Sequence, residues 1–572
     1  MATGHEFTSV GQPQRTQKLK RQKTNMQQSD TTGGSGILDA VVVGAGFAGL
    51  YMVKRLADQG RTVRCIEAAS DVGGTWYWNK YPGAQCDVES LEYSYGFDNA
   101  LQQDWHWTER FARQPEILAY ARHVADRFNL RRHIRFDTRV ESAVYDESSR
   151  LWQVTLAGGE TLRTRICIMG TGNLTAPRVP DIPGLDRFKG RWYHSSRWPN
   201  EGVDFTGMRV ALIGTGSTGI QITPVVAAQA AHLTVFQRSP NFVVPGINRD
   251  LDPQHVRAYK ATYPETRLVA KHSQYGVAGM LPPTQSAFDV SPQERQARYE
   301  KMWGFGSHTP FLTAFTDLLL DQKANDTAAD FVRGKVREIV KDPKVADILT
   351  AFDHPLGARR LCAGNNYYET FNRPNVTLVN VKPAPIETFT EKGLVAGGVE
   401  HEFDIVIFAT GFDAMTGALR EIDIRGRGNQ SLNDKWKDGP ATYLGLMIAG
   451  FPNLFIITGP GSPSVKSNVV LSIEQHVDWI SDCLAALDQR GIETIEADAQ
   501  AEANWVAHVN EVAAPTLYVK TDSWYTGANV PGKPKVFMPY VGGIGRYRKI
   551  CDEVAADNYR GFVLRPKTPA TA

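Results

Sequence analysis

A strand, a glycine-rich turn and a helix follow one another twice in this chain, and no other feature limits its fold as strongly. In the first copy we expect a buried strand at residues 38–43, the turn GAGFAG at 44–49 and a helix from about 49 to 58. A second strand at 62–66 ends at an acid. Such glycines let backbone N–H groups approach a pyrophosphate at the helix N-terminus, and the acid can hold ribose hydroxyls. The pattern predicts a dinucleotide site that includes Gly44, Gly46, Phe47, Gly49 and Glu67.

The second copy has a strand at residues 209–213, the turn GTGSTG at 214–219, a helix to about 231 and a strand at 233–236. No acid follows this strand, and Arg238 and Ser239 stand in its place. An arginine can pair with a 2′-phosphate that a carboxylate would repel. We therefore expect FAD at the first site and NADPH at the second. The alternative for Arg238 is a solvated strand end.

Two dinucleotide folds in one chain indicate electron transfer from a nicotinamide to a flavin. The fold class that follows is α/β, with two Rossmann-like dinucleotide-binding domains and a helical insertion. We expect the FAD-binding domain at residues 37–160 and 410–572 and the NADP-binding domain at 172–245 and 356–405. Residues 246–355 have helical character, with a good helix start at Ser291, and form the insertion.

Length and composition exclude several classes of protein. A chain of 572 residues needs more than one core. The net charge of +2 gives no broad field for nucleic acid or anionic lipid, and no apolar run is long enough to span a membrane. Six cysteines without a CxxC pair or zinc spacing argue against a disulfide reductase and against a metal site, and favour reduced thiols in the cytoplasm.

The first 36 residues are polar and glycine-rich, and we expect them to form a disordered tail. Their basic run, Lys18 to Lys23, is a targeting or docking patch or, as we prefer, part of a solvated tail.

The segment FKGRWYHSSRWP at residues 188–199 lies between the two folds. It resembles the fingerprint FxGxxxHxxxW(P/D) of type I Baeyer–Villiger monooxygenases, and it matches at every fixed position, Phe188, Gly190, His194, Trp198 and Pro199. Residues 73–87, 409–413 and 524–534 are similar to that family's flavin-contacting loop, second nucleotide-domain signature and mobile loop. The resemblance covers about residues 37–566. The CDVES sequence at 86–90 is closer to the phenylacetone- and steroid-type members.

The resemblance implies an activity. NADPH would reduce FAD, a C4a-peroxyflavin would attack a ketone through a Criegee intermediate, and an ester or lactone would result. O2 and a small-molecule ketone would be the partners of a monomer or weak homo-oligomer. Alternatives are a flavin-containing monooxygenase that oxygenates amines or sulfides, an NADPH oxidase that releases H2O2, and a dinucleotide sensor without catalysis.

The resemblance also assigns catalytic residues. A peroxide anion in a dry pocket needs a fixed cation, and arginine never loses its charge. Arg360 matches the family's catalytic arginine and Asp87 its aspartate partner. Arg359 matches a residue, usually lysine, that helps Arg238 hold the 2′-phosphate. Without the resemblance, Arg359 and Arg360 would be interpreted as a surface pair and Asp87 as a helix N-cap.

Other roles carry over by position. FAD contacts are expected from Thr75, Trp76, Tyr77, Trp78, Gln85, Cys86, Asp87, Tyr93 and Val140. NADP contacts are expected from Thr215, Gly216, Ser217, Thr218, Gly219, Ile220, Gln221, Arg238, Ser239, Arg359, Arg360 and Trp524. Ser464, Val465, Lys466 and Ser467 should line the ketone pocket. Lys466 is unusual there and either faces solvent or sets substrate preference. For His194 we expect a structural role, as a hinge between domains.

Overall fold

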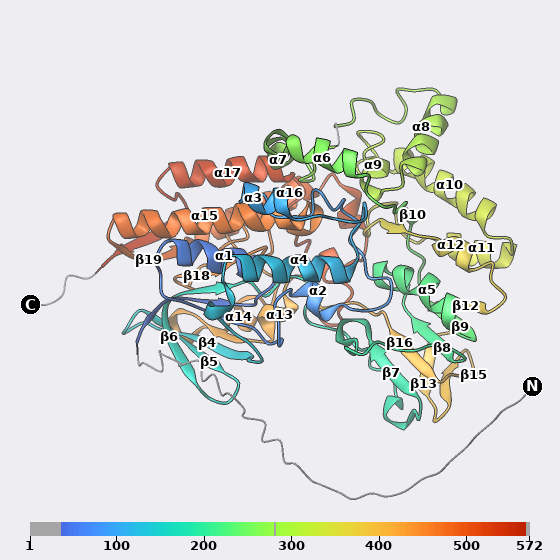
Figure 1. The fold of residues 1–572 in the computed structure, drawn as a ribbon, viewed down its shortest axis with the longest axis horizontal. Coiled ribbons are helices and arrows are strands. Elements are labelled where there is room, and N and C mark those ends of the chain that lie inside the picture. Colours follow the sequence, from blue (N-terminus) through green and yellow to red (C-terminus); the bar gives the residue numbers. More distant parts are fainter. Residues whose placement is uncertain (1–35, 280–281, 568–572) are drawn as a thin grey trace, which may run out of the picture. The chain divides into compact units, whose positions relative to one another are not determined.

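The computed structural model describes residues 36–279 and 282–567. The expected disordered tail and its run Lys18 to Lys23 therefore lie outside the described residues, apart from Gly36. Figure 1 shows the arrangement of the helices and strands, and it is the source of the labels used below.

The first sheet surrounds the first glycine turn. Strand β1 (Leu38–Val43) lies between β2 (Val63–Ile66) and β6 (Thr161–Met169) and is parallel to both. The full strand order is β17-β4-β5-β6-β1-β2-β3, and β18 also pairs with β6. The remaining strands are β3 (Ile134–Arg135), β4 (Val140–Asp146), β5 (Leu151–Leu156), β17 (Asp423–Arg425) and β18 (Leu454–Ile456).

Helices cover one face of this sheet, because apolar side chains of β1 and of the helices share one core. Helix α1 (Phe47–Asp58) packs against the long α15 (Val469–Gln489). In Figure 1 α1, α4 and α15 run side by side above the strands. The other helices of this half are α2 (Thr75–Trp78), α3 (Asn99–Asp104), α4 (Gln114–Arg127), α13 (Gly417–Arg420), α14 (Leu432–Lys435), α16 (Ala499–Ala513) and α17 (Ile544–Ala556). An antiparallel pair of strands, β19 (Ile492–Ala497) and β20 (Phe562–Pro566), completes this half.

The second sheet is entirely parallel, in the order β12-β9-β8-β16-β7. Its strands are β7 (Arg191–His194), β8 (Arg209–Ile213), β9 (His232–Gln237), β12 (Val376–Asn380) and β16 (Ile405–Phe408), and α5 (Ser217–Gln229) follows β8. A small antiparallel sheet consists of β13 (Ile386–Phe389), β14 (Gly393–Ala396) and β15 (Val399–Glu402). Its apolar side chains share a core with one face of the five-stranded parallel sheet. The predicted α/β class with two Rossmann-like folds is confirmed.

The stretch between the two parts of the second fold is helical. It contains α6 (Pro253–Ala261), α7 (Tyr263–His272), α8 (Pro292–Phe305), α9 (His308–Leu312), α10 (Gln322–Ile339) and α11 (Pro343–Thr350). A capping box between Ser291 and Glu294 starts α8, as the sequence predicts. Helix α7 packs against α17, whereas α8 and α10 contribute to the core of the second fold. The helices after Gly246 therefore divide between the two halves.

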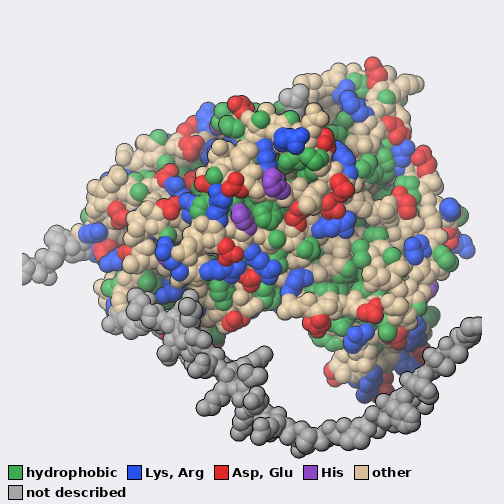
Figure 2. Space-filling view, in the orientation of Figure 1, with side chains coloured by type: hydrophobic (Ala, Val, Ile, Leu, Met, Phe, Trp, Pro, Cys, Tyr) green, Lys and Arg blue, Asp and Glu red, His purple; other side chains and the backbone are tan. Residues whose placement is uncertain are grey.

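A short parallel pair, β10 (Val243–Pro245) with β11 (Cys362–Gly364), connects the helical stretch to the second fold, and α12 (Tyr367–Thr370) follows. Within the described residues no helix is long and apolar enough to cross a membrane, and no three His, Cys, Asp or Glu side chains gather as a metal site would require. All six cysteines are buried and unpaired. The face drawn in Figure 2 intersperses acidic and basic side chains, in keeping with the low net charge.

Candidate active site

The first glycine turn leaves room for backbone and ligand but not for side chains. Gly44 has φ 101°, and a Cβ there would lie 2.6 Å from the carbonyl oxygen of Gly170. A Cβ on Gly49 would lie 1.8 Å from the carbonyl oxygen of Gly44. Helix α1 begins at Phe47, so its first N–H groups point into the turn without intrahelical acceptors. Free N–H groups at such a helix start are the geometry that suits a pyrophosphate.

Glu67 is fixed beside that turn at the end of β2. One carboxylate oxygen accepts from the N–H of Ala45 at 2.6 Å and the other from the N–H of Ala69 at 2.8 Å. Burial raises the pKa of Glu67, and these backbone bonds oppose the rise. Each oxygen keeps a free lone pair, so the carboxylate fits the ribose role that its position predicts.

The aromatic residues expected around FAD lie close together after the turn. Trp76 donates through its indole N–H to the Tyr93 hydroxyl at 3.0 Å. Trp78 lies under the guanidinium of Arg197, which is 4.6 Å from its ring centroid. Arg197 belongs to the fingerprint segment, so this contact joins the flavin loop to the second fold. Val140 begins β4 and is buried in the core on the far face of the first sheet.

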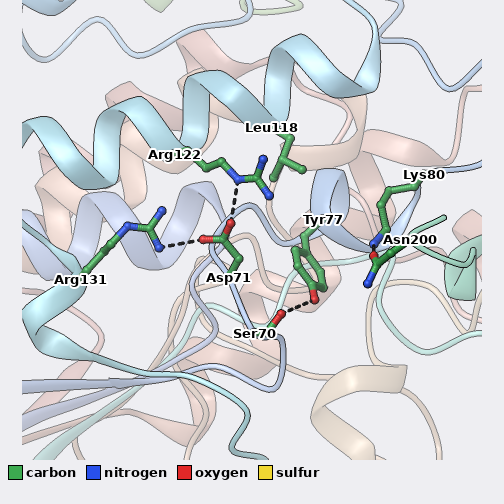
Figure 3. Close-up of a pocket in the computed structure, with 8 residues that line it drawn as sticks. All are labelled: Ser70, Asp71, Tyr77, Lys80, Leu118, Arg122, Arg131 and Asn200. Carbon is green, nitrogen blue, oxygen red and sulfur yellow. Dashed lines mark hydrogen bonds and ion pairs between the residues drawn. The ribbon is translucent and has the colours of Figure 1, made fainter. Parts of the chain in front are cut away.

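A surface pocket of about 630 Å³ opens on the outer side of this loop (Figure 3). Its floor is Asp71, whose carboxylate accepts from Arg122 at 2.7 Å and from Arg131 at 2.8 Å. The Tyr77 hydroxyl hydrogen-bonds with Ser70 at 2.8 Å. These bonds anchor the loop to helix α4 and its surroundings, and they fix the Tyr77 hydroxyl.

The second glycine turn repeats the geometry of the first. Gly214 has φ 114°, and a Cβ on it would lie 2.5 Å from the carbonyl oxygen of Ala409. A Cβ on Gly219 would lie 2.1 Å from the carbonyl oxygen of Gly214. Gly216 is different, because a Cβ there would meet nothing within 4 Å. It is an exposed N-cap of α5 that faces open space, where a phosphate group fits.

A cluster of basic side chains lies at the end of β9. Arg238 is exposed. Burial lowers the pKa of the nearby Arg178, and the positive charge of Arg238 lowers it further. Arg359 approaches Asp353 at 3.2 Å. Asp353 also accepts from Ser239 at 2.8 Å and lies 3.0 Å from Lys382. The predicted residues Arg238, Ser239 and Arg359 are thus brought together, with a carboxylate that the sequence did not predict.

Asp87 and Arg360, 273 residues apart in the sequence, meet between the two folds. The guanidinium Nη2 of Arg360 donates to the two carboxylate oxygens of Asp87 at 2.5 and 2.7 Å. Burial opposes ionisation of Asp87, but Arg360, together with His308 and hydrogen bonds, more than offsets it and lowers the pKa of Asp87 to about 2. Asp87 in turn raises the pKa of Arg360. No helix begins after Asp87, so the helix N-cap interpretation is wrong, and Arg360 is partly exposed and paired with Asp87.

The loop that carries Asp87 is bound to the helix of the second fold. Tyr81 donates to the side chain of Gln221 at 2.9 Å, and Gln221 donates to the backbone carbonyl of Gln85 at 3.0 Å. A Cβ on Gly83 would lie 2.4 Å from the Gln221 carbonyl oxygen. Next to Gln85, Cys86 is buried. The flavin loop and α5 are therefore held in contact, which fixes Asp87 at the junction.

Three further side chains face the pair and carry charge or hydrogen-bonding capacity. Tyr525 is close enough to Arg360 for its guanidinium to act on the phenol, whose pKa burial raises to about 12. His308, at the start of α9, has a buried Nδ1 without a hydrogen-bond partner. Burial lowers the pKa of His308 to about 4, with Asp87 acting against the fall. The third side chain is Lys466.

The four residues expected to line the ketone pocket lie on and after a 3-10 turn, η5 (Ser464–Lys466). Ser464 is fully buried, and Val465 packs against the same aromatic cluster as Trp524. Ser467 shares a hydrogen bond of 2.7 Å with Ser472. Lys466 does not face solvent: its ammonium lies 3.9 Å from the ring centroid of Tyr518 and 4.6 Å from that of Tyr525. The solvent-facing alternative for Lys466 is therefore wrong.

The segment 524–534, similar to a mobile loop, is folded inward. Asn529 donates to the backbone carbonyl of Phe412 at 2.7 Å, and Lys533 pairs with Asp413. Both acceptors belong to the signature at 409–413. Trp524 lies against Tyr525, with ring centroids 4.2 Å apart. The loop therefore covers the junction between the folds.

The fingerprint residues have packing roles. A Cβ on Gly190 would lie 2.4 Å from the Phe188 ring, and Trp198 is buried in the core of the second fold, just before Pro199. His194 ends β7, and its Nδ1 accepts from the backbone N–H of Ser196 at 3.2 Å. Burial lowers the pKa of His194, which favours the neutral ring. These contacts support the structural role expected for this histidine.

Comparisons with known proteins agree with this geometry. The FMO-like family, described as flavin-binding monooxygenase-like, matches residues 39–293. A "Baeyer-Villiger monooxygenase" of Pseudooceanicola batsensis is 46% identical over 94% of this chain and 98% of its own. An oxidized steroid monooxygenase bound to NADP has a TM-score of 0.89 at 49% identity, and a complex of OTEMO with FAD and NADP has 0.90 at 42%; each covers 93% of this chain and 100% of its own. The chain belongs to the flavin-binding monooxygenase family, among its type I Baeyer–Villiger members.

Proposed function

We propose that this chain is an FAD- and NADPH-dependent Baeyer–Villiger monooxygenase. One ketone, one O2, one NADPH and one proton give one ester or lactone, one NADP+ and one water. The observation that carries the proposal is the Asp87–Arg360 pair, placed where the two glycine-turn folds meet. FAD bound here and reduced by NADPH would supply the activation of O2.

The first fold is proposed to hold FAD. Its cradle is the turn Gly44 to Gly49, with Glu67 on a ribose and the aromatic loop 75–78 beside the ring system. The second fold is proposed to hold NADP through Thr215 to Gln221, with Arg238, Ser239 and Arg359 on the 2′-phosphate. We propose that the FAD domain comprises residues 37–160 and 410–572, the NADP domain 172–245 and 356–405, and the insertion 246–355.

Arg360 has the task of holding a fixed positive charge where the carbonyl oxygen gains negative charge during oxygen insertion. Asp87 keeps the guanidinium ionised and oriented, and it occupies only Nη2, which leaves the other nitrogens for the reacting oxygens. The loop 524–534 excludes water from this junction. We infer a cytoplasmic location from six buried, unpaired cysteines.

The experiment is product analysis with the purified holoenzyme, NADPH, isotopically labelled O2 and a panel of aryl, cyclic and steroidal ketones. We expect an ester or lactone that contains one labelled oxygen atom. Oxygenation of amines or sulfides with no ester from any ketone would instead support a flavin-containing monooxygenase that acts on nitrogen or sulfur. Release of H2O2 alone would indicate an oxidase, and a protein purified without flavin would contradict the proposal.

A further inference from the structure

Lys466 is a largely desolvated cation without a carboxylate partner. Its ammonium lies over two buried tyrosine rings, at 3.9 Å from the centroid of Tyr518 and 4.6 Å from that of Tyr525, and it approaches the Tyr525 hydroxyl at 3.5 Å. Among residues 36–279 and 282–567 no Asp or Glu lies within 4.0 Å of it. Contacts with aromatic faces replace only part of the hydration that an ammonium loses when it is buried.

The groups that face this ammonium add one positive charge, that of Arg360. They are Arg360 from the segment before β11, neutral His308 from α9, and the tyrosines of η6 (Leu517–Lys520) and η7 (Trp524–Thr526). Asp87, a carboxylate close to this cluster, is engaged by Nη2 of Arg360. With Arg360 and Lys466 protonated, the cluster carries one more positive than negative charge.

This excess of positive charge affects the protonation of Lys466. Burial lowers the pKa of Lys466 well below its ordinary value, and the charge of Arg360 lowers it further. A negatively charged group that enters beside Lys466 would reverse both effects and stabilise the ammonium. The site is therefore more favourable for an anion than for a neutral group of the same size.

We propose that Lys466 binds a carboxylate of the substrate, and that keto acids are the preferred substrate class of this site. The inference rests on the proposed function, since it places the carbonyl of the same molecule at Arg360. The Tyr525 hydroxyl lies between the two cations, within reach of each. The two cations therefore lie at most about two hydrogen-bond lengths apart, roughly 6 Å, a span that a carbonyl and a carboxylate joined by a short methylene chain can bridge.

A competing explanation is purely structural: Lys466 would anchor the loop 524–534 through Tyr525. The two explanations differ in one measurable quantity, the ratio of kcat/KM for an acid to kcat/KM for its neutral methyl ester. An anchor that is lost lowers both values alike, whereas a carboxylate site that is lost lowers only the first.

The probes are 5-oxohexanoate and 6-oxoheptanoate, each compared with its methyl ester, in assays of ester formation by the holoenzyme. We expect the wild type to prefer the acids by about 10-fold or more, the usual effect of a charge-assisted hydrogen bond. Lys466→Met should bring the ratio close to one, and Lys466→Arg, which retains the charge, should keep a preference for the acids. Lys520→Met, a matched change at an exposed lysine of η6, should leave the ratio as in the wild type.

A wild-type ratio near one, or equal losses with acid and ester in Lys466→Met, would overturn the inference. Failure of the proposed function has a different signature, namely no ester from any ketone. In that case calorimetric titration of the same probes into the holoenzyme decides: tighter binding of the acids that disappears in Lys466→Met supports the carboxylate site, and equal binding of acid and ester rejects it.

Discussion

One guanidinium nitrogen of Arg360, Nη2, serves both carboxylate oxygens of Asp87, at 2.5 and 2.7 Å. A fork-to-fork pair would use two nitrogens. Here both hydrogen bonds to the carboxylate come from Nη2, so the cation keeps donors for other groups. Asp87 sits on a loop that Gln221 binds to the second fold, so the position of the cation depends on the contact between the two folds.

Removal of this cation should separate the two halves of the reaction. Arg360→Ala is expected to keep FAD and its reduction by NADPH but to lower ester formation by ~100-fold or more, as for other groups that stabilise developing negative charge. Stopped-flow absorbance gives the reduction rate and product analysis gives the ester yield.

The matched control for that experiment is Arg337→Ala, an exposed arginine of α10, which should behave as the wild type in both assays. Normal ester yield from Arg360→Ala would remove the arginine from the mechanism. Slow reduction in that variant, with ester formed in proportion, would place Arg360 at the nicotinamide instead.

Gly216 allows a test of the second nucleotide site that leaves the fold unchanged. A Cβ at this position meets no protein atom within 4 Å, so Gly216→Ala should fold and melt like the wild type. If a pyrophosphate lies against Gly216, the added methyl group blocks it, and the KM for NADPH should rise by ~10-fold or more, about 1.4 kcal/mol.

Thermal melting and steady-state kinetics measure the two expectations. Gly304→Ala is the control, because Gly304 in α8 is equally open. A KM for NADPH unchanged in Gly216→Ala would mean that the coenzyme does not approach this turn.

The two glycine turns and their surrounding strands could be predicted from local sequence, because a turn that admits no side chain needs glycine at fixed spacing. The helix starts were placed too late. Helix α1 begins at Phe47 rather than Gly49, and α5 at Ser217 rather than Ile220, because the last glycine of each turn already packs inside the first helical turn.

The site was predictable only in part. Asp87 and Arg360 are far apart in the sequence, and their pairing came from resemblance to a family. His308, Tyr518 and Asp353 escaped notice, because each lies in a segment without a local pattern and reaches the site through tertiary packing. Lys466 could be named but not oriented, since its direction depends on two tyrosines more than fifty positions away.

Arg238 should decide between the two coenzymes. It is exposed at the end of β9, and no carboxylate in the described part of the chain forms an ion pair with it. Its charge is therefore available to a 2′-phosphate. Arg238→Ala should lower kcat/KM for NADPH by ~10- to 100-fold, the range for a charge-assisted hydrogen bond, and leave kcat/KM for NADH nearly unchanged.

Initial rates of coenzyme oxidation give both constants. The same substitution at Arg191, exposed at the start of β7 in the same sheet, serves as control. Equal losses with NADPH and NADH in Arg238→Ala would show that this arginine supports the fold and not coenzyme choice.

Glu474 makes the stability of the protein depend on pH near neutrality. It is 3% exposed within α15, where the N–H of Gly96 donates to it at 2.6 Å. Burial raises its pKa to about 7, from an ordinary value near 4.5. The folded state therefore holds a proton that the unfolded state releases, and the stabilisation is complete below pH 4.5 and is lost as the pH rises through 7. The loss is on the order of 3 kcal/mol.

Glu474→Gln removes this titration but keeps an oxygen to accept from Gly96. The Tm of the variant minus that of the wild-type holoenzyme should be lowest at pH 5 and should increase steadily to pH 8, because only the wild type must bury a charge there. Glu391→Gln, at a carboxylate that is 71% exposed, should give a nearly constant difference over the same range. A constant difference for Glu474→Gln as well would mean that this carboxylate has the same pKa in the folded and the unfolded protein.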